Sequence, residues 1–353
     1  MENTDSSPEL LANCGSHDAS PECELPRERR RSRPWESSEL NNRLAETEPG
    51  SASTRSIEDS GVLKGSSTDG SLEHLEDQAE QKEAEQKEAS VKIPRRWDRF
   101  VRLVGEPAVR TLMNSHVVVF GLGGVGSYAA EALARSAVGS LTLVDFDDVC
   151  VTNVNRQLQA FPGTVGQSKS ELLGKRIQAI NPDAVVDPVQ AFYGPDNSAA
   201  LLSPRPDYVI DAIDNVTAKL HLLTTCLQAK IPVVSVTGSG GRLDPTQVEV
   251  ADLSKTKGDP LARVLRKELS RRGFDTSRRV GLPVVFSNEV VMEPIAPGWD
   301  AEGFRCICPH AEDSPHACEK RRVIYGTASF VTSTFGMAAT SVVIRGLTGN
   351  SAD

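Results

Sequence analysis

The sequence HVVVFGLGGVGSYAAEALARSAVGSLTLVDFDD, residues 116–148, predicts a strand, a glycine-rich turn, a helix and a second strand. Val117–Phe120 is a short apolar run rich in β-branched residues, which is typical of a strand buried on both faces of a parallel sheet. The helix is predicted over Val125–Ser136, because Gly139 stops it, and Leu141–Val144 forms the second strand. This order is that of a βαβ unit, which binds a nucleotide at the turn after its first strand.

The turn has the pattern G-x-G-x-x-G, with Gly121, Gly123 and Gly126 at its fixed positions and Gly124 between them. The first glycine permits a tight turn, the second lets the backbone approach a phosphate, and the third lets the helix pack on the strand. Asp145 ends the second strand, where an acidic residue would hold a ribose hydroxyl. The pattern predicts a nucleotide with its phosphates at a helix N-terminus. By itself it does not distinguish NAD, FAD and ATP.

The charge of the 353 residues is unevenly distributed. Residues 1–90 contain 21 acidic and 10 basic residues, whereas residues 91–353 contain 27 acidic and 29 basic ones. The net charge of −9 therefore belongs to the N-terminal tail and does not argue against a polyanionic substrate.

No apolar run approaches the roughly 20 residues of a membrane span. The N-terminus is acidic and unlike a signal peptide, and the seven scattered cysteines are typical of reduced thiols. We therefore expect a cytoplasmic protein, with attachment to an organelle surface left open.

Composition and periodicity predict three parts of the chain. Residues 1–92 form a disordered acidic tail, because they cannot bury enough apolar surface to offset the entropy of ordering. Residues 93–241 form an α/β domain with a doubly wound, mostly parallel Rossmann-like sheet. Residues 242–353 form a smaller α+β part continuous with it. That part contains a basic helix at 260–272 and an apolar helix at 328–347, which is suited to burial against the sheet or a subunit partner.

Polar residues follow the second strand in a dense group. Asp147 stands two residues after Asp145, and Arg156 offers a planar fork suited to phosphate oxygens. Lys169 lies in the first turn of a helix that extends to Ile180, where a lysine is unfavourable for the helix dipole unless an anion is nearby. The alternative for Lys169 is a solvated side chain, and the sequence leaves both open.

A predicted fourth strand, Tyr208–Asp214, carries Asp211 and Asp214 at its end. Carboxylates at the carboxyl end of a central strand lie at the usual ligand crevice. One of them could hold Mg²⁺ together with water and phosphate oxygens. Alternatively, Asp214 or Asn215 caps the helix that follows. The two interpretations are compatible, because a cap uses only one residue.

Together these motifs resemble the ATP-binding site of the ubiquitin-activating-like superfamily, which includes ThiF and MoeB. The matching segments are the glycine turn, Asp145-Phe-Asp147, Asn153-Val-Asn-Arg156-Gln157, Gly166-x-x-Lys169 and Asp211-Ala-Ile-Asp214-Asn215. The resemblance implies that the nucleotide is ATP, bound at the glycine turn and at Asp147. It also implies the following roles: Asp145 holds the ribose, Arg156 and Lys169 hold the triphosphate, Asp214 holds Mg²⁺, and Asn153 and Gln157 steady the loop. Arg102 would reach the γ-phosphate in the other subunit of a homodimer.

Further segments are similar to one branch, the tRNA threonylcarbamoyladenosine dehydratases of the TcdA/CsdL type. They include Arg102-Leu-Val-Gly-Glu106, Gly240-Gly-Arg-Leu-Asp-Pro-Thr-Gln247, Val285-Phe-Ser-Asn-Glu289 and Val331-Thr-Ser-Thr-Phe-Gly336. The resemblance implies that Mg-ATP adenylates the threonyl carboxylate of the modified adenosine beside the tRNA anticodon. The carbamoyl group then closes on the activated carbonyl to form an oxazolone, and AMP leaves. Which tRNAs are used, and whether there is a sulfur-transfer partner, stay open.

Two further segments allow more than one interpretation. Residues 255–279 contain nine basic side chains: Lys255, Lys257, Arg263, Arg266, Lys267, Arg271, Arg272, Arg278 and Arg279. They are either a nucleic-acid surface or an ordinary solvated helix face. Residues 305–318 contain Cys306, Cys308, His310, His316 and Cys318. Because their spacing is not that of a usual zinc site, we expect reduced thiols in a loop, with zinc as the alternative.

The main alternative function is an adenylating activator of a ubiquitin-like or sulfur-carrier protein. That branch typically carries two C-x-x-C pairs for zinc, and this chain has no C-x-x-C and no cysteine between residues 237 and 260. A non-catalytic nucleotide sensor is disfavoured because the phosphate and metal residues are all present. An NAD oxidoreductase is disfavoured because no histidine or tyrosine stands in a recognisable setting for hydride transfer.

Overall fold

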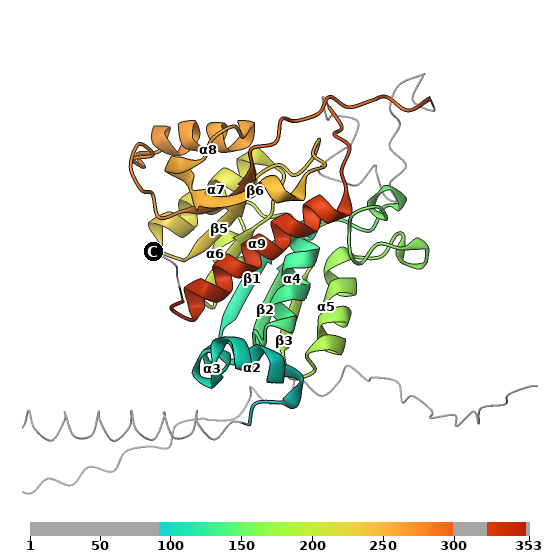
Figure 1. Cartoon of the computed structure of the whole chain (residues 1–353), viewed down its shortest axis with the longest axis vertical. Helices are drawn as coiled ribbons and strands as arrows, with labels where there is room; N and C mark the ends of the chain where they lie inside the picture. The colour runs from blue at the N-terminus through green and yellow to red at the C-terminus, as the bar shows by residue number, and fades with distance from the viewer. Residues whose placement is uncertain (1–91, 299–322, 351–353) are drawn as a thin grey trace, which may run out of the picture. The chain divides into compact units, whose positions relative to one another are not determined.

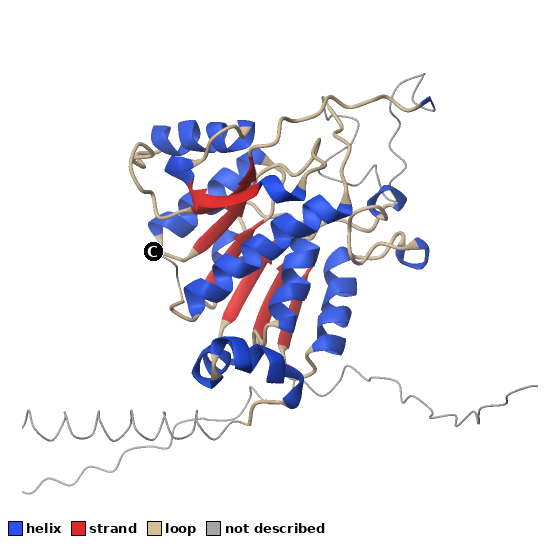
Figure 2. Cartoon of the chain, in the orientation of Figure 1, coloured by secondary structure: helices blue, strands red, loops and turns tan. Residues whose placement is uncertain are grey.

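Seven strands form one sheet in the order β3-β2-β1-β4-β5-β7-β6 (Figure 2). The structure is a computed structural model that describes residues 92–298 and 323–350 of the 353. The strands are β1 His116–Phe120, β2 Ser140–Val144, β3 Val185–Val189, β4 Tyr208–Asp211, β5 Val233–Val236, β6 Val248–Asp252 and β7 Pro283–Ser287. Neighbouring strands pair in parallel, except that β6 and β7 pair antiparallel. The two edge strands are therefore β6 and β3, and β3 carries Asp187 and Pro188.

Helices cover both faces of this sheet. They are α2 Asp98–Val104, α3 Glu106–Met113, α4 Gly126–Arg135, α5 Lys169–Ile180, α6 Ser198–Leu201, α7 Val216–Gln228, α8 Pro260–Arg271 and α9 Ser329–Leu347. Short 3₁₀ helices lie at Arg95–Trp97, Val151–Asn153, Pro162–Thr164, Pro245–Gln247 and Leu253–Lys255. Figure 1 shows α4, α5 and α9 in front of the strands.

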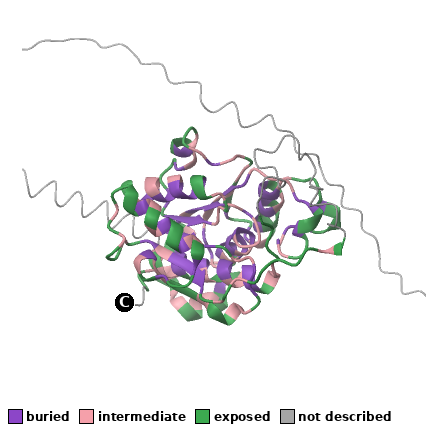
Figure 3. Cartoon of the chain, turned by 90° about the horizontal axis from the view of Figure 1, so that it is seen from above, coloured by how far each residue is buried: buried purple, intermediate pink, exposed green. Residues whose placement is uncertain are grey.

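The alternation of side chains along β1 creates two hydrophobic cores. Val117 and Val119 pack into the core that α4, α5 and α9 cover, whereas Val118 and Phe120 pack into the core that α7 and α8 cover. Successive residues of a strand point to opposite faces, so an apolar run is required where both faces are covered. Figure 3 shows the buried residues along the strands and the inner helix faces. The predicted α/β fold with its mostly parallel sheet is confirmed.

The predicted elements agree with the structure except at their ends. The strand Val185–Val189 has the predicted bounds, and the basic helix α8 ends one residue early. The fourth strand ends at Asp211 instead of Asp214, because the chain turns there towards α7. The division at residue 241 stays a prediction. The predicted disordered tail falls outside the described residues, apart from Lys92.

Helix α9 is the apolar helix that the sequence predicts at the C-terminus. Of the helices in the described ranges, it is the one long and apolar enough to cross a membrane by length and composition. It packs on α4 and on the sheet, and Val331, Phe335 and Ala339 are inaccessible to solvent. Its apolar composition is therefore explained by burial in the protein core, and burial against the sheet is confirmed.

Candidate active site

The glycine turn lies against the end of β4. Gly121 has a φ of +86°, and a Cβ on this residue would lie 2.6 Å from the carbonyl oxygen of Ala212. Gly126 begins α4, and a Cβ there would lie 1.8 Å from the carbonyl oxygen of Gly121. Only glycine permits these approaches. The turn thus brings the N-terminus of α4 to the carboxyl ends of β1 and β4, as the sequence pattern predicts.

Asp145 joins the glycine turn to the end of β2. Its side chain is buried, and its Oδ2 accepts a hydrogen bond from the Leu122 N–H at 2.6 Å. Its Oδ1 accepts one from the Asp147 N–H at 2.9 Å. Burial raises the pKa of Asp145, and the nearby positive charge of Lys169 opposes this rise. The carboxylate therefore fixes the turn while it stands at the predicted ribose position.

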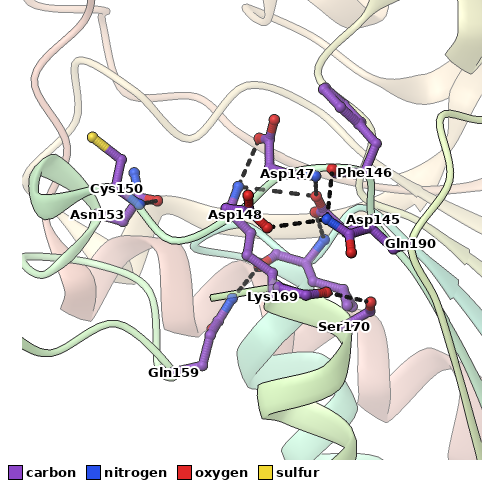
Figure 4. Close-up of polar contacts among 12 residues, drawn as sticks. Asp145, Phe146, Asp147, Asp148, Cys150, Asn153, Gln159, Lys169, Ser170 and Gln190 are labelled. Atoms are coloured by element: carbon purple, nitrogen blue, oxygen red, sulfur yellow. Dashed lines mark hydrogen bonds and ion pairs between the residues drawn. The ribbon is translucent and has the colours of Figure 1, made fainter. Parts of the chain in front are cut away.

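Lys169 is buried between two carboxylates (Figure 4). Its Nζ lies 2.7 Å from Asp147 Oδ2 and 3.9 Å from Asp145 Oδ1. Burial opposes the charge on Lys169, but the two carboxylates outweigh it, so the pKa of this lysine is raised. The alternative of a solvated lysine is wrong. The sequence predicted an anion near Lys169, because a lysine is unfavourable in the first turn of a helix, and Asp145 and Asp147 are such anions. Contact between Lys169 and a triphosphate stays a prediction.

The loop between β2 and α5 is held by its own polar side chains. Asn153 Oδ1 accepts a hydrogen bond from the Cys150 N–H at 3.0 Å. Asn155 Nδ2 donates to the carbonyl oxygen of Thr327 at 2.8 Å, just before α9. Arg156 donates through its NH1 to Thr152 O at 2.7 Å, so its guanidinium lies over this loop. The structure therefore assigns Asn153 a loop-steadying contact and places Arg156 on the same loop.

Two glutamines are buried next to the glycine turn. Gln157 Nε2 would lie 3.9 Å from a Cβ on Gly123, and Gln159 Nε2 donates to Leu122 O at 2.8 Å. The side-chain oxygens of both glutamines have no hydrogen-bond partner within the described ranges. Buried acceptors without donors are costly, so a water or ligand donor would stabilise them. Gln157 was predicted from the sequence and Gln159 was not, although the Gln-x-Gln spacing after Arg156 was an available signal.

The two acidic residues at the end of β4 have different environments. Asp211 is inaccessible, and its Oδ2 accepts hydrogen bonds from Lys219 Nζ at 2.6 Å and Ser235 Oγ at 2.7 Å. Asn215 caps α7 by accepting from the Ala218 N–H at 2.9 Å. Asp211 is thus neutralised internally and the cap uses Asn215. Asp214 is the residue to which the family resemblance assigns Mg²⁺.

A single carboxylate is sufficient for Mg²⁺, but it is not sufficient for a metal whose ligands are mostly protein side chains. Across residues 92–298 and 323–350, no group of three or more His, Cys, Asp or Glu side chains is arranged to hold a metal. Mg²⁺ usually keeps several waters and binds through one or two carboxylates together with phosphate oxygens. Asp214, which follows the Ala212–Ile213 backbone packed on Gly121, therefore fits Mg²⁺ bound with a nucleotide. The predicted alternative of zinc at Cys306, Cys308, His310, His316 and Cys318 falls outside the described residues.

A pocket of about 480 Å³ opens beyond the end of β3, beside the start of α7. Its lining includes Phe192, Tyr193, Ala218 and His221, and most of its walls are apolar. Phe192 also packs edge-on against Phe146 with ring centroids 5.3 Å apart, which connects the pocket wall to the Asp145–Asp147 segment. Sequence reasoning missed this pocket. The aromatic pair that follows the third predicted strand was its only signal.

Residues 97–352 match the ThiF family. The chain belongs to this family. It is 43% identical over 247 residues to the tRNA threonylcarbamoyladenosine dehydratase of Escherichia coli, covering 69% of this chain and 90% of that relative. The dehydratase of Bacillus subtilis is 47% identical over 186 residues, which cover 53% of this chain and 72% of the relative.

A solved structure extends this similarity within the ThiF family. The E. coli dehydratase TcdA in complex with ATP has a TM-score of 0.63 and 40% identity, and the match covers 74% of this chain and 98% of that one. The predicted membership of the TcdA-type branch of the ThiF/MoeB superfamily is therefore confirmed.

In this ThiF-family chain, Arg102 does not join the other predicted site residues. It lies on α2, is exposed, and pairs with Asp98 of the same helix at 3.1 Å. Figure 1 shows α2 beyond the amino ends of β1 and β2, whereas the glycine turn follows the carboxyl end of β1. A contribution of Arg102 to a site would therefore have to be made in a second copy of the chain.

The buried ion pair of Asp211 and Lys219 should contribute to the stability of the protein. Replacing Lys219 alone with methionine leaves a buried carboxylate without its cation, so we expect the free energy of unfolding to fall by about 3–5 kcal/mol. The double variant Asp211→Asn/Lys219→Met removes both charges and should recover most of this loss. Chemical denaturation of the three proteins measures it. A single variant as stable as the parent would show that this ion pair does not contribute to stability.

Proposed function

We propose that this protein is an ATP-dependent tRNA threonylcarbamoyladenosine dehydratase. The observation that carries the proposal is the convergence, at one edge of the sheet, of the glycine turn, the Asp145–Lys169–Asp147 cluster and the end of β4. It is supported by a 40% identical structure whose chain is almost entirely matched and which binds ATP. Relatives with the same name match 69% and 53% of the chain.

The residues of this site fit Mg-ATP. The turn of Gly121, Gly123, Gly124 and Gly126 would receive the phosphates at the N-terminus of α4. Asp145 would accept a ribose hydroxyl, and Lys169 and Arg156 would offset charge on the triphosphate. Asp147, Asn153 and Gln157 would hold the surrounding loop in place. Asp214 would hold Mg²⁺, which supplies positive charge against the phosphates.

The adenine ring suits the pocket beside α7. Its aromatic and apolar walls could stack on a planar base. The pocket adjoins Phe146, which stands between Asp145 and Asp147. A ribose held at Asp145 would therefore lie close to the pocket, and the attached base could enter it.

The proposed reaction has two steps. In the first, a threonyl carboxylate oxygen attacks the α-phosphorus, an O–P bond forms, and pyrophosphate leaves with the electrons of the broken bond. Lys169 and Arg156 would stabilise the charge that develops on the leaving phosphates. In the second, the carbamoyl oxygen attacks the activated carbonyl, the ring closes, AMP leaves, and the carbamoyl nitrogen loses a proton. The site has only to hold the reacting groups together for this closure, so it needs no protein nucleophile.

The described thiols agree with a reaction that does not use cysteine. Cys150 and Cys226 are the free cysteines of the described ranges, and both are buried. Burial raises the pKa of Cys226 to about 12, so this thiol stays protonated at neutral pH. Whether there is a sulfur-transfer partner, which the sequence leaves open, is not decided by these two thiols. The predicted role of Arg102 requires the predicted homodimer, because this residue lies away from the site of its own chain. The cytoplasmic location stays a prediction.

A mass-spectrometric assay tests the proposed function. The full chain is incubated with Mg-ATP and tRNA bearing threonylcarbamoyladenosine, and the nucleosides are analysed under mild conditions. We expect the modified nucleoside to lose the mass of one water, only when ATP is present, with AMP and pyrophosphate released. An unchanged nucleoside, with pyrophosphate released only after a ubiquitin-like protein is added, would instead establish the activator alternative.

A further inference from the structure

The nine basic side chains around α8 fall into two groups in the structure. Arg266 is half-buried and donates to the carbonyl oxygen of Thr256 at 2.9 Å, so it stabilises the fold and is not a free surface charge. Three others are paired with acidic neighbours: Arg271 and Arg272 with Glu268, and Arg278 with Asp275. The nine residues could not be distinguished from the sequence alone. In the structure, these four have partners within the protein.

The other five basic residues are exposed and have no carboxylate partner in the part of the chain that the structure describes. We call them the α8 surface: Lys255, Lys257, Arg263, Lys267 and Arg279. Arg263 and Lys267 lie four residues apart on α8 and therefore share one helix face. Cations that repel one another without counter-charges favour an anionic partner.

One carboxylate holds the two loops of this surface together. Asp252 accepts hydrogen bonds from the N–H groups of Val280, Gly281 and Leu282, at 3.1, 2.8 and 3.2 Å. It also accepts one from the Ser254 N–H at 3.0 Å. The loop that carries Lys255 and Lys257 is thereby fixed to the loop that carries Arg279. The backbone that carries the five basic residues is therefore held either by helix α8 or by hydrogen bonds to Asp252.

Both ends of α8 connect this surface to the candidate active site. At its start, Asp259 caps the helix and pairs with buried Arg242 at 2.8 Å, directly after the glycine-rich segment 237–241. At its end, Arg272 lines the pocket proposed for adenine. Figure 1 shows α8 beside α7, whose start carries Asn215 at the site. A polyanion on the α8 surface would thus lie close to the pocket proposed for adenine.

We propose that the α8 surface binds the phosphate backbone of the tRNA whose modified nucleoside reacts at the neighbouring site. This inference rests on the proposed function. Lysine and arginine that lack acidic neighbours suit phosphates, and contacts of this kind position a nucleic acid without reading its sequence. Val264 is the one large apolar side chain exposed between residues 252 and 282, so the surface lacks the apolar face with which amphipathic helices enter membranes.

The test compares two charge-matched quadruple variants of the full chain. In one, Lys257, Arg263, Lys267 and Arg279 are replaced with glutamine. In the control, four exposed basic residues elsewhere, Lys92, Arg95, Lys175 and Lys230, are replaced with glutamine. Binding of tRNA bearing threonylcarbamoyladenosine is measured over a range of salt concentrations, and dehydration is measured against tRNA concentration.

We expect the α8 variant to bind tRNA at least about tenfold more weakly, with a salt slope reduced by up to about 3, because each lost phosphate contact removes about 0.7 to 0.9. KM for tRNA should rise while kcat at saturating tRNA and KM for ATP stay near the parent values. The control should keep both affinity and slope.

Two results would overturn the inference. If the α8 variant and the control bind tRNA equally while the parent dehydrates its substrate, the surface does not bind tRNA although the proposed function stands. If the α8 variant loses binding to vesicles containing phosphatidylserine but not to tRNA, the partner is a membrane. A parent protein that never dehydrates the nucleoside would instead refute the proposed function itself.

Discussion

AMP formation should be lost when Asp214 is replaced with alanine. Asp214 follows the end of β4 and is the carboxylate proposed to hold Mg²⁺, whereas Asp211 pairs with Lys219 and Asn215 caps α7. Without it, the metal would no longer be fixed against the leaving phosphates, and we expect turnover to fall on the order of 10²- to 10³-fold or more. Release of AMP and pyrophosphate from Mg-ATP and substrate tRNA measures the loss.

The loss should be specific to the metal. The variant is expected to unfold at the same denaturant concentration as the parent and to require much more Mg²⁺ for the ATP-binding signal in calorimetry. The control is Asp187→Ala, which removes an exposed carboxylate from β3. If Asp214→Ala formed AMP at the parental rate and with the parental Mg²⁺ dependence, Asp214 would have no metal role.

Replacement of Lys169 with methionine should cause the second large loss. The change removes a cation from a buried cluster that also contains Asp145 and Asp147. We expect kcat/KM for ATP to fall on the order of 10²- to 10³-fold, because charge on the triphosphate is no longer offset. The free energy of unfolding should also fall by about 3–5 kcal/mol, because a buried carboxylate is left without its partner.

A second variant separates the two effects of Lys169. Asp145→Asn/Lys169→Met removes both buried charges, so it should recover stability. Its turnover is compared with that of Asp145→Asn alone, because Asp145 is itself proposed to hold the ribose, and it should be lower. The control is Lys175→Met, an exposed position on the same helix. A double variant with the turnover of Asp145→Asn would show that Lys169 serves only the fold. Normal turnover in the single variant would remove its phosphate role.

The raised pKa of Lys169 also predicts how stability depends on pH. For a group whose pKa is higher in the folded state, the stabilisation is fully present below the unfolded value of about 10.4 and is lost as pH rises through the folded value. The parent protein should therefore lose stability above about pH 10.4 more steeply than Asp145→Asn/Lys169→Met does. Denaturation curves on both sides of that pH would show the difference.

The sequence predicted those parts of the site that depend on local chain geometry. The glycine turn, the acid at the end of β2 and the helix that begins at Lys169 each follow from residues that are close in sequence. The continuous apolar run of β1 also predicted that both faces of the sheet are covered, because no polar residue stands between Val117 and Phe120.

The parts that sequence reasoning missed depend on contacts between distant segments. Nothing near Asp211 indicated that Lys219 and Ser235 would converge on it, because one lies on α7 and the other on β5. Likewise, Arg266 could not be separated from its basic neighbours until its contact with Thr256 was seen. Burial and pairing decide which charges are available to a ligand, and both are set by tertiary structure.

The edge strand β3 limits how a second copy of this chain could attach. Pro188 has no N–H to donate, and Asp187 places an exposed charge beside it. A strand with these residues cannot continue a hydrogen-bonded ladder into another molecule, and this protects against edge-to-edge aggregation. A homodimer that brings Arg102 to a neighbour's nucleotide would therefore not be joined through β3, and the sheets of the two copies would stay separate along this edge.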